Sequence, residues 1–92
     1  MRVRVRGSVQ GVGFRHHTML RARSLGLGGW VANLEDGSVE AVFEGPPDRV
    51  ASMLDWCRRG PGGASVEGVE EHDERPAGER EFRIAFAPGA SG

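Results

Sequence analysis

The stretch from Gly7 to Arg15 holds the residues of this sequence best suited to bind an anion, and it reads Gly7-Ser8-Val9-Gln10-Gly11-Val12-Gly13-Phe14-Arg15. Its three glycines let the backbone bend so that successive N–H groups converge on one point. Arg15 can offer a planar, two-pronged guanidinium to a phosphate or a carboxylate. The chemistry that this pattern indicates is therefore the binding of a small anionic group.

The glycine spacing alone does not identify a ligand. A Walker loop needs Gly-Lys-Ser/Thr, which is absent, and His16 stands where a dinucleotide fingerprint needs glycine. A tight turn between a strand and a helix, with no ligand bound, explains the same glycines. Both interpretations stay open on the loop by itself.

The histidines and the cysteine give no metal cluster. His16 and His17 occupy adjacent helical positions, which point apart, and no carboxylate or cysteine follows either at a spacing of three or four. Each is interpreted as a surface or packing histidine. Cys57 lies on the apolar side of a predicted helix, where we expect a buried packing residue.

Length and composition describe one domain with one core. The chain has 92 residues, of which 38% are hydrophobic. No apolar run approaches the about 18 residues of a membrane span, and Met1-Arg2-Val3 begins a strand rather than a signal peptide. A single cysteine excludes an internal disulfide. We therefore expect a cytoplasmic protein that does not enter a membrane.

The charge is distributed unevenly along the chain. Residues 1–33 carry six arginines and no acidic residue, whereas residues 34–92 carry six arginines and all thirteen acids. The cationic first third suits a small anionic ligand near the glycine loop. A general bias toward arginine, consistent with the absence of lysine, is the alternative. The acidic remainder argues against a nucleic-acid partner.

Apolar periodicity predicts the elements that must position the loop. Strands are expected at 2–8, 29–34, 38–44, 64–72 and 82–86, and helices at 14–25 and 47–59. In the strand at 64–72, Gly68 separates two valines that are out of phase, which indicates a bulge or a bend. Asp36-Gly37 predicts a hairpin between the second and third strands.

This order, βαββαβ with a last or split strand, predicts the fold. Two helices cannot cover both faces of so small a sheet, so both should pack on one face of an antiparallel sheet. The result is an α+β, ferredoxin-like two-layer sandwich with the first strand in the centre. We expect one domain over residues 1–87 and a flexible tail over residues 88–92.

Two segments of the chain together resemble the acylphosphatase family. The first is the stretch from Gly7 to Arg15, and the second is Gly29-Trp30-Val31-Ala32-Asn33-Leu34-Glu35-Asp36-Gly37-Ser38-Val39, continuing to Gly45. Their order and separation match those of the family signatures, and the predicted fold order matches as well. The resemblance covers nearly all of the chain except the tail.

The resemblance implies hydrolysis of the carboxyl–phosphate bond of acyl phosphates to carboxylate and inorganic phosphate. By matching positions, Arg15 and Asn33 would be catalytic. Arg15 would bind the phosphoryl group with backbone N–H groups of Gln10, Gly11, Val12, Gly13 and Phe14, and Asn33 would hold the attacking water. No metal, cofactor or covalent phosphoenzyme is implied. Without the first segment, Asn33 would be interpreted as a turn-forming residue.

Two other functions are compatible with the fold. A non-catalytic phosphate-binding module would prefer a longer chain with further domains, so we expect the free-standing hydrolase, acting as a monomer on a small-molecule acyl phosphate. An RNA-binding domain would need aromatic side chains exposed on the open sheet face. The sequence has no tyrosine, and Trp30 and Phe14 are interpreted as core or site-wall residues.

Overall fold

A computed structural model of the 92-residue chain describes residues 1–85. In chain order the elements are β1 (Arg2–Ser8), α1 (Phe14–Ser24), β2 (Gly28–Asn33), β3 (Val39–Glu44), α2 (Pro47–Arg59), β4 (Ser65–His72) and β5 (Phe82–Ile84). Each begins and ends within about one residue of the expected range, apart from the last strand, whose predicted member Phe86 lies outside the described residues. So does the tail expected at 88–92. Within residues 1–85, neither helix is long and apolar enough to span a membrane.

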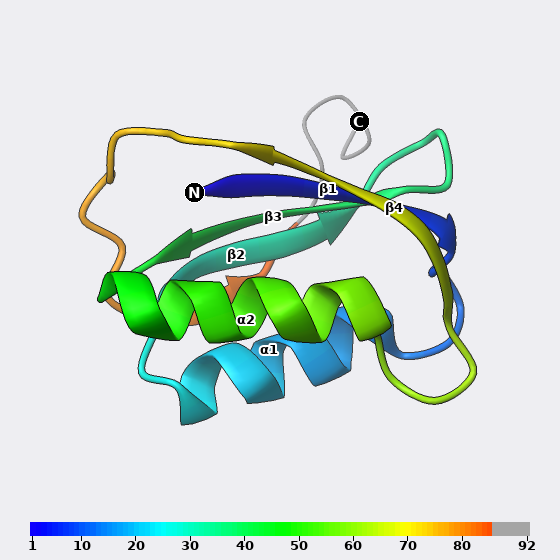
Figure 1. Cartoon of the computed structure of the whole chain (residues 1–92), viewed down its shortest axis with the longest axis horizontal. Coiled ribbons are helices and arrows are strands. Elements are labelled where there is room, and N and C mark those ends of the chain that lie inside the picture. Colours follow the sequence, from blue (N-terminus) through cyan, green and yellow to red (C-terminus); the bar gives the residue numbers. More distant parts are fainter. Residues whose placement is uncertain (86–92) are drawn as a thin grey trace.

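The strands form one sheet in the order β4-β1-β3-β2-β5, and both helices lie on the same face of it (Figure 1). This arrangement confirms the predicted two-layer, ferredoxin-like sandwich. Two details differ from the prediction. The strand β5 pairs in parallel with β2, so the sheet is mixed. Because β5 extends the sheet beyond β2, β3 occupies the centre and β1 is an interior strand beside it.

The core lies between the sheet and the two helices. Val3 and Val5 of β1 point inward as predicted and are at most 1% exposed. In α2 the predicted apolar stripe is buried, and it consists of Val50, Met53, Leu54 and Cys57. Burial raises the pKa of the Cys57 thiol to about 12, which fits the expected packing role because the thiol stays protonated and unreactive at neutral pH.

Glutamates pair with the arginines of β1. Arg2 bonds the carboxylates of Glu40 and Glu74, at 3.1 and 2.5 Å. Arg4 lies 3.9 Å from Glu40, and Arg6 lies 3.5 Å from Glu70. These three arginines are half of the six in residues 1–33. Because they pair with glutamates, they do not provide positive charge for a ligand at the glycine loop, as the composition of residues 1–33 led us to expect.

The bulge predicted near Gly68 occurs one residue earlier. Arg6 pairs with Gly68 and Gly7 pairs with Val66, which leaves Glu67 as the extra residue of β4. Gly7 itself has φ 129°, and a Cβ there would lie 2.1 Å from the carbonyl oxygen of Ser65. The close approach of β4 to the end of β1, just before the glycine loop, therefore requires glycine.

The short strand β5 is held in place from both sides. The carboxylate of Glu44, at the end of β3, accepts 3.0 Å hydrogen bonds from the backbone N–H groups of Ala77, Gly78 and Glu79. Past β5, the N–H of Ala85 donates to the carbonyl of Val31 at 2.8 Å. Glu44 thus holds the segment that leads into β5, and hydrogen bonds between β2 and residues 81 and 85 hold the two ends of the strand.

Substitution of Gly7 by alanine tests the close approach of β4. We expect Gly7→Ala to lower the free energy of unfolding by about 1–3 kcal/mol, because alanine is strained at this φ and its Cβ overlaps the backbone of β4. The measurement is urea denaturation followed by circular dichroism. Gly62→Ala is the matched control, since a Cβ at Gly62 meets nothing within 4 Å. Equal stability of the two variants would contradict the assigned contact.

Candidate functional site

The glycine loop and the end of β2 meet at one end of the sandwich. The loop joins β1 to α1, and in Figure 1 the start of α1 and the tip of β2 lie at the same end of the molecule. Gly11 and Gly13 adopt φ of 78° and 76°, a left-handed conformation that glycine adopts without strain. Gly13 is also the residue that caps α1, and it provides no side-chain cap.

The backbone at this junction has unpaired donors. Residues 10–13 form a turn, but from Gln10 to His16 no backbone N–H makes a short, well-aligned hydrogen bond within residues 1–85; the series resumes with the N–H of His17, 2.9 Å from the carbonyl of Gly13. The first N–H groups of a helix have no intrahelical partner, and the helix dipole adds partial positive charge there. A loop and helix start of this kind are suited to receive an anion.

A pocket of about 140 Å³ opens at the junction. We call it the anion pocket; its lining residues are Val9, Gly11, Gly13, Phe14, Arg15, His16, Asn33 and Ile84. Arg15 and Asn33, which lie eighteen positions apart in the sequence, are thus brought to one cavity. None of its lining residues is acidic, so no carboxylate there competes with an anionic ligand.

The side chains of Arg15 and Asn33 have polar atoms without a partner in the described part of the chain. Arg15 is half-buried, and within residues 1–85 its guanidinium makes no ion pair. Asn33 is also half-buried, and its Oδ1 atom is buried with no hydrogen-bond donor within reach in the described part of the chain. A buried carbonyl oxygen without a donor is costly unless water or a ligand supplies one.

Gln10 connects the glycine loop to the hairpin that follows Asn33. Its Nε2 donates to the carbonyls of Leu34 and Ser38, both at 2.8 Å. The same turn is closed by Asp36, whose Oδ1 accepts bonds from the Ser38 hydroxyl at 2.5 Å and from the Ser38 N–H at 2.9 Å. These bonds fix the distance between the loop and the end of β2.

The other predicted loop residues divide into two groups. Gly11, Gly13 and Phe14 line the anion pocket, whereas Gln10 and Val12 do not. The side chain of Gln10 points into the hairpin, and Val12 packs against the core. For these two residues the predicted contact with substrate concerns the backbone N–H alone, and it stays a prediction.

Three residues of the pocket were not among the predicted site residues. Val9 and His16 flank the glycines, and Ile84 comes from β5. The alternation of Phe82 and Ile84 predicted the strand but not the position of its end. Ile84 reaches the pocket because β5 adds to the sheet beside β2, a pairing that periodicity does not specify.

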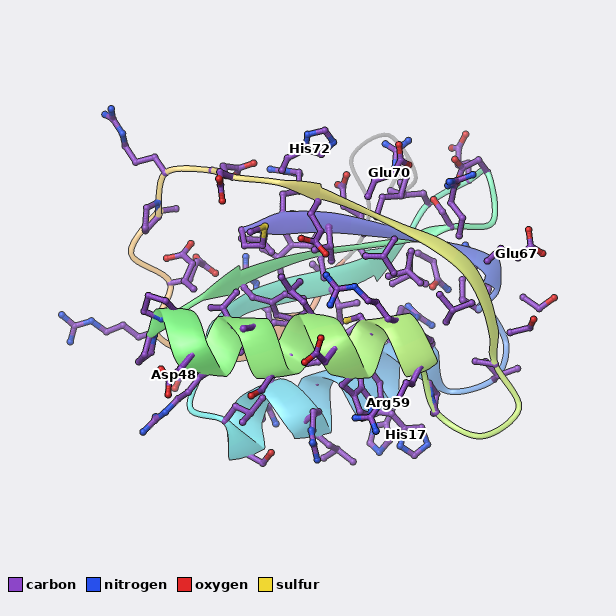
Figure 2. The ribbon with its side chains drawn as sticks, in the orientation of Figure 1. His17, Asp48, Arg59, Glu67, Glu70 and His72 are labelled. Atoms are coloured by element: carbon purple, nitrogen blue, oxygen red, sulfur yellow. The ribbon has the colours of Figure 1, made fainter. Side chains whose placement is uncertain are left out.

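Charge is distributed differently on the two sides of the molecule. In Figure 2 His17 and Arg59 extend on the helix side, whereas Glu70 and His72 extend on the side of β4. The sheet order places β4 at the edge opposite β5, and neither Glu70 nor His72 lines the anion pocket. Among the residues that line the pocket, Arg15 carries the permanent charge, and it is positive.

A larger hollow, of about 770 Å³, lies at another part of the surface. It is lined by the residues around Gly26 and by 78–83, and three of its charged side chains are engaged in contacts. Arg83 pairs with Glu79, and the Nε of Arg23 donates to the carbonyl of Phe82 at 3.0 Å. The smaller pocket differs in that it brings Arg15 and Asn33 together with the glycine loop at the start of α1.

The chain is similar to known proteins over nearly its whole length. The acylphosphatase family model matches residues 1–84. An acylphosphatase of Synechococcus sp. is 54% identical over 80 residues, covering 87% of this chain and 85% of that protein. One of Burkholderia thailandensis is 56% identical over 78 residues, covering 85% and 79%. A crystal structure of acylphosphatase from Bacillus subtilis superposes with a TM-score of 0.88 at 34% identity, covering 92% of this chain and 96% of that one.

Removal of the Ser38 hydroxyl tests the hairpin beside Asn33. The Ser38 hydroxyl, and then its N–H, lower the pKa of Asp36 below the usual value by hydrogen bonding to the carboxylate. The turn is therefore stabilised at neutral pH, and this contribution is lost as the pH falls through the lowered pKa. We expect Ser38→Ala to raise the pKa of Asp36 toward about 3.9, as measured by NMR titration of its carboxyl carbon.

Ser52→Ala, an exposed change on α2, provides the control and should leave the pKa of Asp36 where it is. An identical titration of Asp36 in the wild type and in Ser38→Ala would show that the hydroxyl does not hold this carboxylate.

Proposed function

This chain belongs to the acylphosphatase family, and we propose that its hydrolysis of acyl phosphates takes place in the anion pocket. The substrate is a small molecule in which a carboxyl group is joined to phosphate. The oxygen of a water molecule attacks phosphorus, the bond from phosphorus to the acyl oxygen breaks, and the electron pair leaves with the carboxylate. The products are a carboxylate and inorganic phosphate.

The leaving group explains which catalytic groups are needed. A carboxylate is a stable anion, so its departure needs little help from a general acid. Phosphoryl transfer then depends mainly on positioning and on stabilisation of the charge on the phosphoryl oxygens. A site without a nucleophilic side chain is sufficient for direct attack by water.

Arg15 and the free N–H groups from Gln10 to His16 provide the charge stabilisation in this proposal. A guanidinium and backbone donors that are already in place cost no reorganisation during the reaction. Each charge-assisted hydrogen bond contributes about 1.5–3 kcal/mol. Arg15 follows the loop directly in sequence, so the charge and the backbone donors converge on the same phosphoryl group.

Asn33 holds the attacking water in this proposal. Its Oδ1 accepts a hydrogen bond from the water, which leaves a lone pair of the water oxygen directed at phosphorus. The carboxamide is neutral, so it does not repel the phosphoryl oxygens as a carboxylate would. The proton that the water loses passes to the phosphate product.

One observation carries this assignment above the others. Asn33 lines the same 140 Å³ pocket as Arg15, and its buried Oδ1 has no hydrogen-bond partner in the described part of the chain. A turn-forming asparagine would have its side-chain oxygen bonded to the backbone of its own turn. Here Asp36 and Gln10 fill that role, which leaves Asn33 available for water.

We place the enzyme in the cytoplasm, as a monomeric domain over residues 1–87 that needs no metal or cofactor. The single cysteine is buried, which is compatible with a reducing compartment. The ion pairs of Arg2, Arg4 and Arg6 with glutamates disfavour a nucleic-acid surface on the sheet.

Replacement of Arg15 tests the phosphoryl-binding role. We expect Arg15→Gln to lower kcat/KM for benzoyl phosphate at least about a hundredfold, because a donor to the transition state is lost. Arg15→Lys should fail as well, since an ammonium cannot make the planar two-point contact. The assay is spectrophotometric, with the chelator EDTA present, and we expect no loss from the chelator.

Arg21→Gln is the matched control, because Arg21 is an exposed arginine of the same helix and lies outside the pocket lining. Normal turnover by Arg15→Gln would refute the assignment. Phosphate binding by the wild type without any turnover would instead favour a non-catalytic phosphate-binding module.

Replacement of Asn33 separates water positioning from substrate binding. We expect Asn33→Ala to lower kcat by about a hundredfold or more while the inhibition constant of inorganic phosphate changes less than about threefold. Steady-state kinetics with phosphate as a competitive inhibitor gives both values. A variant with an unchanged kcat and weakened phosphate binding would place Asn33 among the phosphate-binding groups.

A further inference from the structure

The anion pocket is too small to enclose a whole substrate. Its volume is about 140 Å³, whereas pockets that enclose drug-sized ligands measure about 300–1,000 Å³. With the phosphoryl group on the loop and Arg15, the acyl group has to lie at the mouth. Whatever side chains are exposed at the mouth will therefore contact it.

Few side chains are available at the mouth. Among the lining residues Val9 and Phe14 are buried, and Arg15 and Asn33 are half-buried. Gly11 and Gly13 are exposed but have no side chain. The exposed side chains that remain are His16, on the first turn of α1, and Ile84, on β5.

Ile84 exposes apolar surface at the mouth of the anion pocket. It is 40% exposed, and within residues 1–85 the only other large hydrophobic side chain that is exposed is Leu20, at 49%. Leu20 lies on α1 and does not line the pocket. Ile84 pairs with Val31 of β2, and the hydrogen bond from Ala85 to Val31 fixes the end of β5, so its position is held by the sheet.

We propose that Ile84 contacts the acyl group of the substrate and selects for acyl phosphates with an apolar or aromatic acyl group. The inference rests on the function proposed above and extends it to the substrate class. The contact removes apolar surface of both partners from water, and its strength grows with the apolar area of the acyl group. An acetyl group is too small to gain much from it, whereas a benzoyl group gains more.

His16 supports the opposite expectation. An imidazole at the mouth favours a polar or anionic acyl group, with which it can form a hydrogen bond or an ion pair. The two residues therefore predict different substrate classes. Ile84 is favoured because its pairing with Val31 of β2 and the adjacent hydrogen bond from Ala85 to Val31 hold its exposed surface in place.

The experiment compares acetyl phosphate and benzoyl phosphate as substrates of the full chain. We expect Ile84→Ser to raise KM for benzoyl phosphate about three- to tenfold, within the range for partial loss of a hydrophobic contact. KM for acetyl phosphate and the inhibition constant of inorganic phosphate should change less than twofold. The kcat values should stay the same, because the contact is equal in the ground state and the transition state.

Two variants complete the design. Leu20→Ser makes the same kind of change at the other exposed aliphatic residue and should leave both substrates unaffected. Ile84→Val keeps an apolar contact and should restore most of the affinity for benzoyl phosphate. Thermal unfolding of each variant confirms that the compared proteins are folded at the assay temperature.

The possible outcomes distinguish failure of the proposed Ile84 contact from failure of the proposed hydrolase activity. Equal effects of Ile84→Ser on both substrates, or loss of discrimination in His16→Ala instead, would overturn the role of Ile84 while the hydrolase remains. If the wild-type chain hydrolyses neither substrate, the proposed function fails and the role of Ile84 fails with it.

Discussion

The structure depends on a short run of backbone that has no hydrogen-bond partner of its own. Between the last pairing of β1 and the first full turn of α1, the N–H groups from Gln10 to His16 point to no acceptor within residues 1–85. Buried or half-buried donors are normally paired. Gly11, Gly13 and His16 of this run are exposed, so a ligand can reach them, and an anionic oxygen is an acceptor that suits a helix start.

The rest of the fold keeps that run in place and brings a second group to it. β1 is an interior strand, so the loop starts from a backbone fixed on both sides. The bulge in β4 and Gly7 set the direction in which the chain leaves the sheet. Gln10 then ties the loop to the β2–β3 hairpin, and this tie places Asn33 across the pocket from the loop. In the proposed mechanism, binding and water positioning thus come from two parts of the chain that the Gln10 side chain connects.

Much of this arrangement could be predicted from the sequence. The apolar periodicity of α2 and the alternation of Val3 and Val5 specified the elements and their buried faces, because these patterns reflect the period of each structure. The pairing of strands that are distant in the sequence was harder to predict. Nothing in Phe82-Arg83-Ile84 indicates that the strand runs parallel to β2, and so the presence of Ile84 at the pocket was not predicted. Likewise, the type of Gln10 does not reveal that its side chain bonds the hairpin rather than the ligand.

The central claim is that an anion takes the place of the missing acceptors. It is tested most directly by titrating inorganic phosphate into the ¹⁵N-labelled chain and following the backbone amide resonances by NMR. The account predicts that the largest shifts fall on the amides from Gln10 to His16, with smaller shifts at Asn33, and that they saturate together. Shifts centred instead on the arginines of the larger hollow, Arg23, Arg80 and Arg83, with the loop amides unmoved, would contradict it.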